Sequence, residues 1–395
     1  MNTGESRTTH HTPRTTHHIS IASELEQFNK LPTESLRTVV GFDGFIDEII
    51  HVVAKRESFC GFERMKTITD FAQRLQDAAG RSANIEFVSL KSKIGGNGPI
   101  MAAALARLGS KVTYIGNVGF PEIHPVFHPL AARSSVISLG EPAHTDALEF
   151  NDGKIMFGKM EILRIVTWER IVEVIPLPHL IEIVSGAKLL AMVNWTMVPG
   201  MTDIWRHLLE EVCPHLPPAE ERFAFFDLAD PEKRYIEDLR EAMRLISQFT
   251  TSHKVIFGLN EREAIQVARA LGAPDDLFPP NHAPRTTHSV AETLSNFIAS
   301  KLGIYAVVVH PVDCASATVD GRTYTQPGPY TDSPVITTGA GDHFNAGFCI
   351  AQIAGLDPQT SLLLGVHCSG YYVRTAASPD LPSLLHFVET SGIKS

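Results

Sequence analysis

Short apolar runs alternate with segments of helical periodicity from about residue 37 onward, and this alternation constrains the fold more than any other feature. The runs are apolar throughout and rich in β-branched and aromatic residues, which indicates strands buried on both faces of a sheet. Parallel strands need crossover helices between them. The sequence therefore predicts an α/β fold with a doubly wound, mostly parallel sheet. The predicted strands span 37–42, 84–90, 111–118, 187–193, 222–228, 254–259 and 305–310.

One region interrupts this alternation. Residues 134–167 alternate apolar and polar side chains around Asn151-Asp152-Gly153, a tripeptide typical of hairpin turns. We expect these residues to form most of a small β-sheet lid over the crevice of the large sheet, with 43–56 as a second candidate segment. Residues 21–395 then make one domain. Residues 1–20 form a polar tail, rich in His and Thr, that buries too little apolar surface to be ordered.

Composition narrows the classes of function. The chain has 34 Lys and Arg against 44 Asp and Glu, so a net charge of −10 leaves no surplus of cations for a nucleic-acid-binding face. No apolar run reaches the roughly 18 residues of a membrane span. Five cysteines without a C-x-x-C pair indicate free thiols in a reducing compartment. We therefore expect a cytoplasmic protein that acts on a small molecule and binds neither nucleic acid nor membrane.

The most specific motif is SPVITTGAGDHFNAGFCIAQIAGL at 333–356. Its pattern predicts a strand that ends at Thr338, a turn at Gly339 and Gly341, and a helix that begins near Asp342. The free N–H groups at such a helix start favour an anion, and the helix dipole adds to this preference. A carboxylate placed there either caps the helix or accepts a proton from a bound hydroxyl group, and the motif alone leaves both open.

Three further segments give the motif a context. They read VVGFDGFIDEI at 39–49, GGNGPIMAAALARLG at 95–109 and GLNEREA at 258–264. Together and in this order, the four segments resemble the ribokinase-like (PfkB) family of carbohydrate kinases over roughly residues 37–390. The resemblance implies a sheet with a β lid, and transfer of the γ-phosphate of ATP to a hydroxyl group of a sugar or sugar-like alcohol. It also implies Mg²⁺ as cofactor and is compatible with a homodimer formed through the lid.

The resemblance assigns the catalytic residues. The family's general base falls on Asp342, and its anion hole for the ATP phosphates falls on the backbone of Gly339, Ala340 and Gly341. Asn260 and Glu263 match the family's Asn-x-x-Glu, which helps to hold the ATP phosphates and Mg²⁺, the metal usually through water. The same spacing is also that of a helix capping box, with Asn at the N-cap and Glu three residues later.

The substrate contacts implied by the resemblance lie near the N-terminus. Asp47 matches the Asp that binds substrate hydroxyl groups, and Asp43 is its rival. Gly95, Gly96 and Gly98 match the di-glycine segment that closes against the sugar, and Asn97 beside them is a further substrate contact. A surface Asp in a turn and a plain Gly-rich turn before a helix are the structural alternatives.

The chain also departs from the family pattern. Ile100 stands where the family usually has a sugar-binding Asn, and Ile336 replaces an Asp that commonly binds a monovalent cation. His310-Pro311-Val312-Asp313-Cys314-Ala315 replaces a Gly-containing loop beside the nucleotide phosphates, and Phe120-Pro121-Glu122 replaces paired acidic residues. These features indicate a divergent member and leave the phosphate donor and the monovalent-cation dependence open. A nucleoside kinase of the same family and a non-catalytic sugar- or nucleotide-binding relative are the alternatives.

Overall fold

The computed structural model describes residues 21–31, 35–59, 61–218, 221–278 and 288–392, so the predicted tail at 1–20 lies outside it. Nine strands form one large sheet in the order β14-β13-β12-β11-β10-β9-β1-β5-β6. The seven strands from β12 to β6 are parallel, and β13 and β14 add an antiparallel edge. The strands are β1 (Arg37–Phe42), β5 (Lys111–Gly116), β6 (Ser135–Ser138), β9 (Leu189–Met192), β10 (Phe223–Asp227), β11 (Lys254–Leu259), β12 (Ala306–Val309), β13 (Cys314–Val319) and β14 (Arg322–Pro327).

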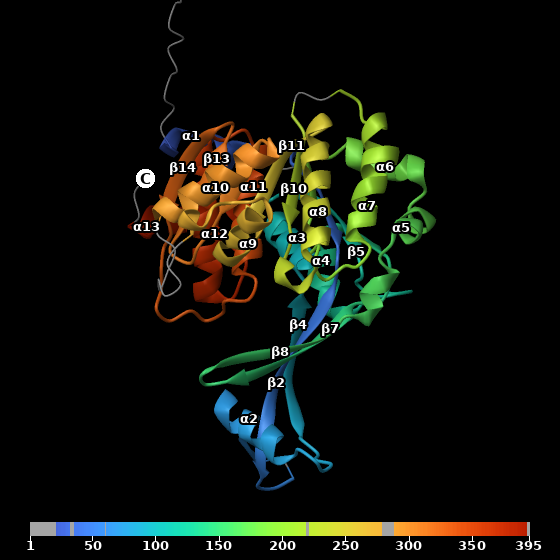
Figure 1. Cartoon of the computed structure of the whole chain (residues 1–395), viewed down its shortest axis with the longest axis vertical. Helices are drawn as coiled ribbons and strands as arrows, with labels where there is room; N and C mark the ends of the chain where they lie inside the picture. Colours follow the sequence, from blue (N-terminus) through green and yellow to red (C-terminus); the bar gives the residue numbers. More distant parts are fainter. Residues whose placement is uncertain (1–20, 32–34, 60, 219–220, 279–287, 393–395) are drawn as a thin grey trace, which may run out of the picture.

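Helices cover both faces of this sheet, and Figure 1 shows the resulting three layers. Successive side chains of a strand point to opposite faces, so Phe225 joins the core on one side while Phe226 joins the core on the other. One layer contains α1 (Ile21–Lys30), α3 (Asn97–Arg107), α4 (His128–Ala131), α11 (Ala340–Ile353), α12 (Pro358–Thr375) and α13 (Leu381–Thr390). The other contains α5 (Trp168–Val174), α6 (Leu177–Ser185), α7 (Met201–His207), α8 (Ile236–Gln248), α9 (Glu261–Ala270) and α10 (His288–Leu302).

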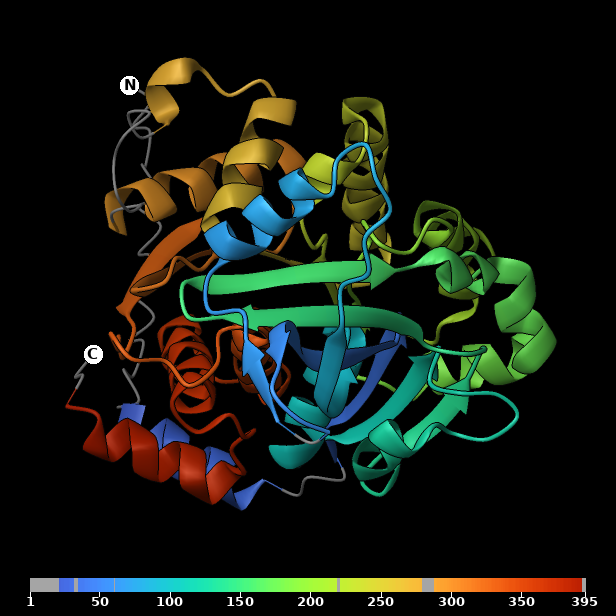
Figure 2. The same cartoon turned by 90° about the horizontal axis from the view of Figure 1, so that it is seen from below.

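A second, five-stranded sheet projects from one end of the large one (Figure 1). Figure 2 shows its long hairpin, in green, crossing in front of the rest of the domain. Its apolar side chains form a small core of their own with Phe71 of a short helix. The elements are β2 (Phe45–Arg56), β3 (Phe62–Arg64), α2 (Ile68–Asp77), β4 (Phe87–Gly95), β7 (Ala143–Phe150) and β8 (Gly153–Lys159).

The structure corrects where two predicted segments belong. The run at 84–90 was predicted for the parallel sheet, but β4 pairs antiparallel with β2 in the small sheet. The short apolar run in this segment is typical of a buried strand, yet most residues of β4 are exposed. Within 134–167, only β7 and β8 belong to the small sheet, because β6 pairs with β5 at the edge of the large one. The segment 43–56 supplies β2, the strand to which β3, β4 and β7 all pair.

The other predicted strands are found in the large sheet as β1, β5, β9, β10, β11 and β12. The β13–β14 hairpin was not predicted, although its turn residues Asp320 and Gly321 both have positive φ and are typical of tight hairpins. None of the helices in the described part of the chain is long and apolar enough to cross a membrane. Cys213, Cys314, Cys349 and Cys368 are free thiols, as expected, and Cys60 lies outside the described residues.

Candidate active site

The Gly339–Asp342 segment begins helix α11, as predicted, but the predicted strand ending at Thr338 is absent, because residues 328–338 form no strand. Gly339 is the N-cap with φ 95°, a left-handed conformation that favours glycine. A Cβ atom at Gly339 would also lie 3.1 Å from the Tyr372 hydroxyl group. The first N–H groups of a helix have no carbonyl partner within it. This turn therefore offers amide donors and the positive end of the helix dipole to an anion.

Two cavities lie on either side of this turn. The first has a volume of about 370 Å³ and is lined by Gly339 and Asp342, whereas the second, of about 340 Å³, is lined by Ala340 and Gly341. The start of α11 thus separates the two spaces and contributes to both. Sequence-predicted residues around the first cavity also include Asp47, Gly96, Asn97 and Glu263. The second cavity is lined by Asn260, His310, Val312, Tyr330, Thr337 and Phe344, among others.

Asp342 is almost fully buried, with 6% of its surface exposed. Asn97 at the start of α3 donates from Nδ2 to Asp342 Oδ1 at 2.9 Å. Burial raises the pKa of Asp342 to about 8, the Asn97 hydrogen bond opposes that shift, and the nearby Asp43 and Glu263 carboxylates add to it. A carboxyl group with this pKa can take up a proton near neutral pH, which is the property that general-base catalysis needs.

Asp47 lies on β2 and points into the first cavity from the small sheet. Burial raises its pKa, while Lys93, with Nζ 3.8 Å from Asp47 Oδ2, is the main opposing influence. Gly95 leaves room for this carboxylate, because a Cβ atom at that position would lie 2.3 Å from Asp47 Oδ1. Asp47 therefore has the position for a hydroxyl-binding residue, and Gly95 makes space for its side chain.

Asp43 has a different place. It is fully buried and does not line the first cavity. Its Oδ1 accepts from the Gly98 N–H at 2.8 Å, and its Oδ2 accepts from Asn194 Nδ2 at 2.6 Å. A Cβ atom at Gly96 would approach Asp43 Oδ2 to 2.7 Å. Asp43 thus holds the start of α3 and the Asn194 side chain in place, and the cavity-facing role falls to Asp47.

Asn260 and Glu263 form the capping box that their spacing allows. Glu263 Oε2 accepts from the Asn260 N–H at 2.9 Å, and its Oε1 accepts from the Asp230 N–H at 2.9 Å. Glu263 also lines the first cavity, and burial raises its pKa. The nearby Asp227 is buried and has a strongly raised pKa, caused first by burial and then by the Glu263 and Asp342 charges. The capping role and a place beside the cavity therefore coexist.

Some of the divergent residues lie at the site, whereas Ile336 and Phe120-Pro121-Glu122 line neither of the two cavities. Ile100 lines the first cavity and adds apolar surface to it. His310 lines the second cavity, where it packs on the Phe344 ring at 4.7 Å between centroids. Burial lowers the pKa of His310 to about 4, so the ring is neutral, and its Nε2 has no partner among the described residues. Ile336 offers no side-chain oxygen and lies against a separate cavity beside the small sheet.

Sequence reasoning missed several residues of the first cavity. Asn194 follows β9 with φ 62°, and Ala229 and Asp230 follow β10 with φ 56° and 62°. Lys233 Nζ lies 3.1 Å from Asp230 Oδ2. All four line the cavity at the carboxyl ends of parallel strands, where ligands bind in such sheets. Only that general rule could have indicated them, because no glycine marks these left-handed positions.

Comparison with known proteins places this site in a family. The family model for prokaryotic ketohexokinase matches residues 15–391. The chain belongs to the prokaryotic ketohexokinase family. A ketohexokinase of Haloferax volcanii is 31% identical over 353 residues, which cover 89% of this chain and 90% of that protein. As a member of this family, the chain is an ATP-dependent sugar kinase.

Solved structures of the ribokinase family share the fold. Arabidopsis thaliana ribokinase complexed with ribose and ATP has a TM-score of 0.57 at 16% identity, covering 90% of this chain and 99% of that one. A probable sugar kinase from Rhizobium etli has a TM-score of 0.60 at 19% identity, covering 92% of this chain and 99% of that one. Methanocaldococcus jannaschii nucleoside kinase has a TM-score of 0.56 at 13% identity, covering 89% and 98%. The predicted ribokinase-like fold is confirmed.

Proposed function

We propose that this ketohexokinase family member transfers the γ-phosphate of ATP to a hydroxyl group of a ketohexose, with Asp342 as general base. The observation that carries the proposal is the position of Asp342. Its buried carboxyl group lines the first cavity in the opening turn of α11, while the preceding Ala340 and Gly341 line the second. A sugar in the first cavity and a nucleotide in the second would meet at this turn.

The chemistry follows from the groups present there. The Asp342 carboxylate accepts the proton of the attacking hydroxyl group, and the backbone of Gly339, Ala340 and Gly341 stabilises charge on the transferring phosphoryl group. Asp47 accepts hydrogen bonds from sugar hydroxyl groups, and Asn97 lies between the sugar and the base. Gly95 lets the backbone lie close to the Asp47 carboxylate, and Gly96 does the same beside Asp43.

Mg²⁺ fits the acidic edge of the site. Carboxylate oxygens and waters are the ligands it prefers, and bound at the ATP phosphates it neutralises their developing charge. Both oxygens of Glu263 already accept backbone N–H groups, so Glu263 would hold the ion through water, with Asn260 beside the phosphates. The dependence on ATP also supports a cytoplasmic location, and the net charge of −10 supports a small-molecule partner rather than nucleic acid.

The test is a screen of ADP production by the purified protein with MgATP and ketohexoses, aldohexoses, pentoses and nucleosides. We expect a ketohexose to give the highest kcat/KM. A nucleoside as the best acceptor would overturn the substrate assignment, and binding of sugar without any turnover would indicate a non-catalytic relative.

Asp342→Asn tests the base. Asn keeps the size of the side chain but cannot accept the proton, so kcat should fall by about 10²–10⁴-fold. Thermal unfolding of the same variant is the control, because the structure gives no reason for it to unfold more easily. Turnover within a few-fold of the wild-type value would show that another group takes the proton.

A further inference from the structure

A cluster of three polar side chains occupies the face of the small sheet that points away from the sugar cavity. Strands β2 and β7 are parallel neighbours, and their register pairs Glu48 with Asp146. Side chains alternate between the two faces of a sheet. Asp47 and Thr145 line the cavity, so Glu48, Asp146 and the preceding His144 lie on the opposite face. The cluster is thus separate from the kinase site but uses the same two strands.

The three side chains converge on one nitrogen atom. His144 Nε2 lies 3.1 Å from Glu48 Oε2 and 3.1 Å from Asp146 Oδ1. One ring N–H cannot point at both oxygens with good geometry. The second oxygen of Asp146 binds Lys159 Nζ at 2.8 Å, and Ser89 hydrogen-bonds to Glu48. Each side chain is therefore anchored, and the two carboxylates still face one another beside the imidazole.

Two like charges directly opposite on neighbouring strands destabilise a sheet unless a cation lies between them. Ser89 and His144 both hydrogen-bond to the Glu48 carboxylate. Lys159 is largely exposed and pairs with Oδ2 of Asp146, so Asp146 Oδ1 and Glu48 Oε2 are left facing the His144 nitrogen. A metal ion between these three atoms would offset the charges of both carboxylates.

The spacing fits a metal ion. Two ligand atoms at about 2.0–2.1 Å from a tetrahedral Zn²⁺ lie about 3.3 Å apart. The observed separations of 3.1 Å match that value with little movement. We propose that Glu48, His144 and Asp146 bind Zn²⁺, with water in the fourth position. Zinc accepts both imidazole nitrogen and carboxylate oxygen as ligands.

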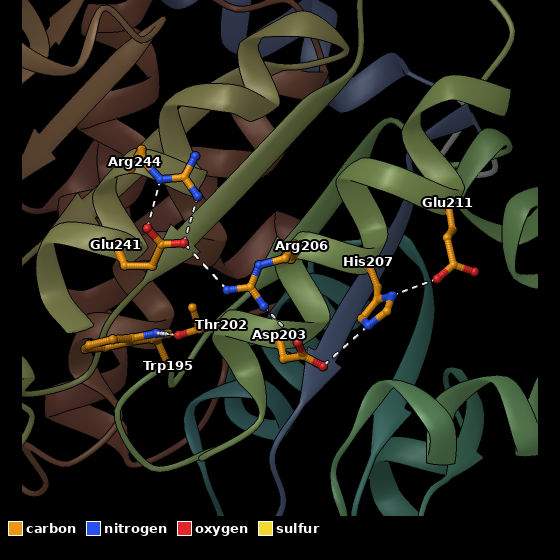
Figure 3. Close-up of polar contacts among 8 residues, drawn as sticks. All are labelled: Trp195, Thr202, Asp203, Arg206, His207, Glu211, Glu241 and Arg244. Carbon is orange, nitrogen blue, oxygen red and sulfur yellow. Dashed lines mark hydrogen bonds and ion pairs between the residues drawn. The ribbon is translucent and has the colours of Figure 1, made fainter. Parts of the chain in front are cut away.

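The structure contains a second cluster of the same residue types that serves as a matched control. Figure 3 shows His207 between Asp203 and Glu211 on one helical segment. There the Nε2 atom is 3.6 Å from Asp203 Oδ2, and Arg206 donates to Asp203 Oδ1 at 2.8 Å. The two carboxylates also face different ring nitrogens, because Glu211 Oε1 lies 2.7 Å from Nδ1, so one ion cannot bind the imidazole between them. We therefore assign the cluster around His207, including Glu169, to surface ion pairing rather than to metal binding.

The experiment compares the full-length wild-type protein with His144→Gln and His207→Gln after treatment with a chelator. Each protein is titrated with Zn²⁺ by calorimetry and with Co²⁺ by visible absorption, which reports four-coordinate sites. The histidines of the tail are present in all three proteins, so their binding cancels in the comparison. We expect His144→Gln to lose one equivalent of metal, or at least about tenfold in affinity, and His207→Gln to match the wild type.

Thermal unfolding gives an independent readout. Zn²⁺ should raise the Tm of the wild type and of His207→Gln but not that of His144→Gln, because binding to the folded state alone stabilises it. Unchanged MgATP-dependent turnover shows that the His144→Gln variant is folded. If this variant does not fold, Glu48→Gln takes its place in the experiment. Equal titrations and equal Tm shifts for all three proteins would overturn the proposal and leave His144 as a hydrogen-bond donor between two carboxylates.

Discussion

At the scale of single residues, the proposed function depends most on the proton affinity of Asp342. Its place in the opening turn of a helix could be predicted from the sequence, because the Gly-Ala-Gly-Asp turn depends on local backbone conformation. Its hydrogen-bond partner could not be predicted, since Asn97 is 245 positions away and meets Asp342 only when α3 and α11 pack together. Long-range packing also explains why Asp43 was a rival to Asp47. The local sequence around these two residues does not reveal which carboxylate faces the cavity.

The pH profile should reflect this environment. The pKa of Asp342 is raised to about 8, and the base must be ionised, so kcat/KM should fall as the pH drops below that value. Asn97→Leu removes a hydrogen bond to the carboxylate and should move this limb about one pH unit toward alkaline values. The measurement is kcat/KM against pH, which reports the free enzyme. Asp342→Asn serves as control because it lacks the titrating group. If the acidic limb of the pH profile does not move in Asn97→Leu, another residue is responsible for that limb.

At the scale of single elements, helix α9 shows how one pattern carries two meanings. The Asn-x-x-Glu spacing predicted both a capping box and a phosphate-side residue pair, and the structure confirms the cap. It adds a contact that no local pattern contains, the bond from the Asp230 N–H to Glu263. This bond exists because β10 and β11 are neighbours in the sheet, so the loop after one meets the helix after the other.

Glu263→Gln should therefore be destabilising. Glu263 uses both oxygens to accept backbone N–H groups, whereas Gln offers one oxygen and turns its NH₂ group toward the other donor. One buried donor left without an acceptor costs about 1–3 kcal/mol of unfolding free energy. Urea unfolding measures this loss, and Mg²⁺ titration of activity in the same variant measures the metal role separately. A stable variant with a raised Mg²⁺ requirement would show that the cap matters less than the metal.

On the scale of the whole molecule, the parallel sheet was predictable strand by strand, whereas the small sheet was predictable only in part. Strands such as β11 and β12 are apolar throughout because helices cover both faces, and this composition is visible in the sequence. The small sheet combines β2 and β4 with β7, about 50 residues further along the chain, and only its β7–β8 hairpin has a local turn signal. Long-range pairing of this kind is fixed by tertiary packing, which a single sequence does not display.

The small sheet should also decide the oligomeric state. Large apolar side chains on its outer strands are exposed, namely Phe87 and Leu90 on β4 and Phe157 on β8, and such exposure favours association. A second copy of the chain is the simplest partner, because β4 and β8 each pair on one side only among the described residues. We expect light scattering to give twice the 43.3 kDa chain mass for the wild type, and one chain mass for Leu90→Glu with Phe157→Glu. Ile236→Glu, which changes an exposed apolar residue on α8, should leave the dimer intact. A wild-type mass of one chain would exclude this dimer.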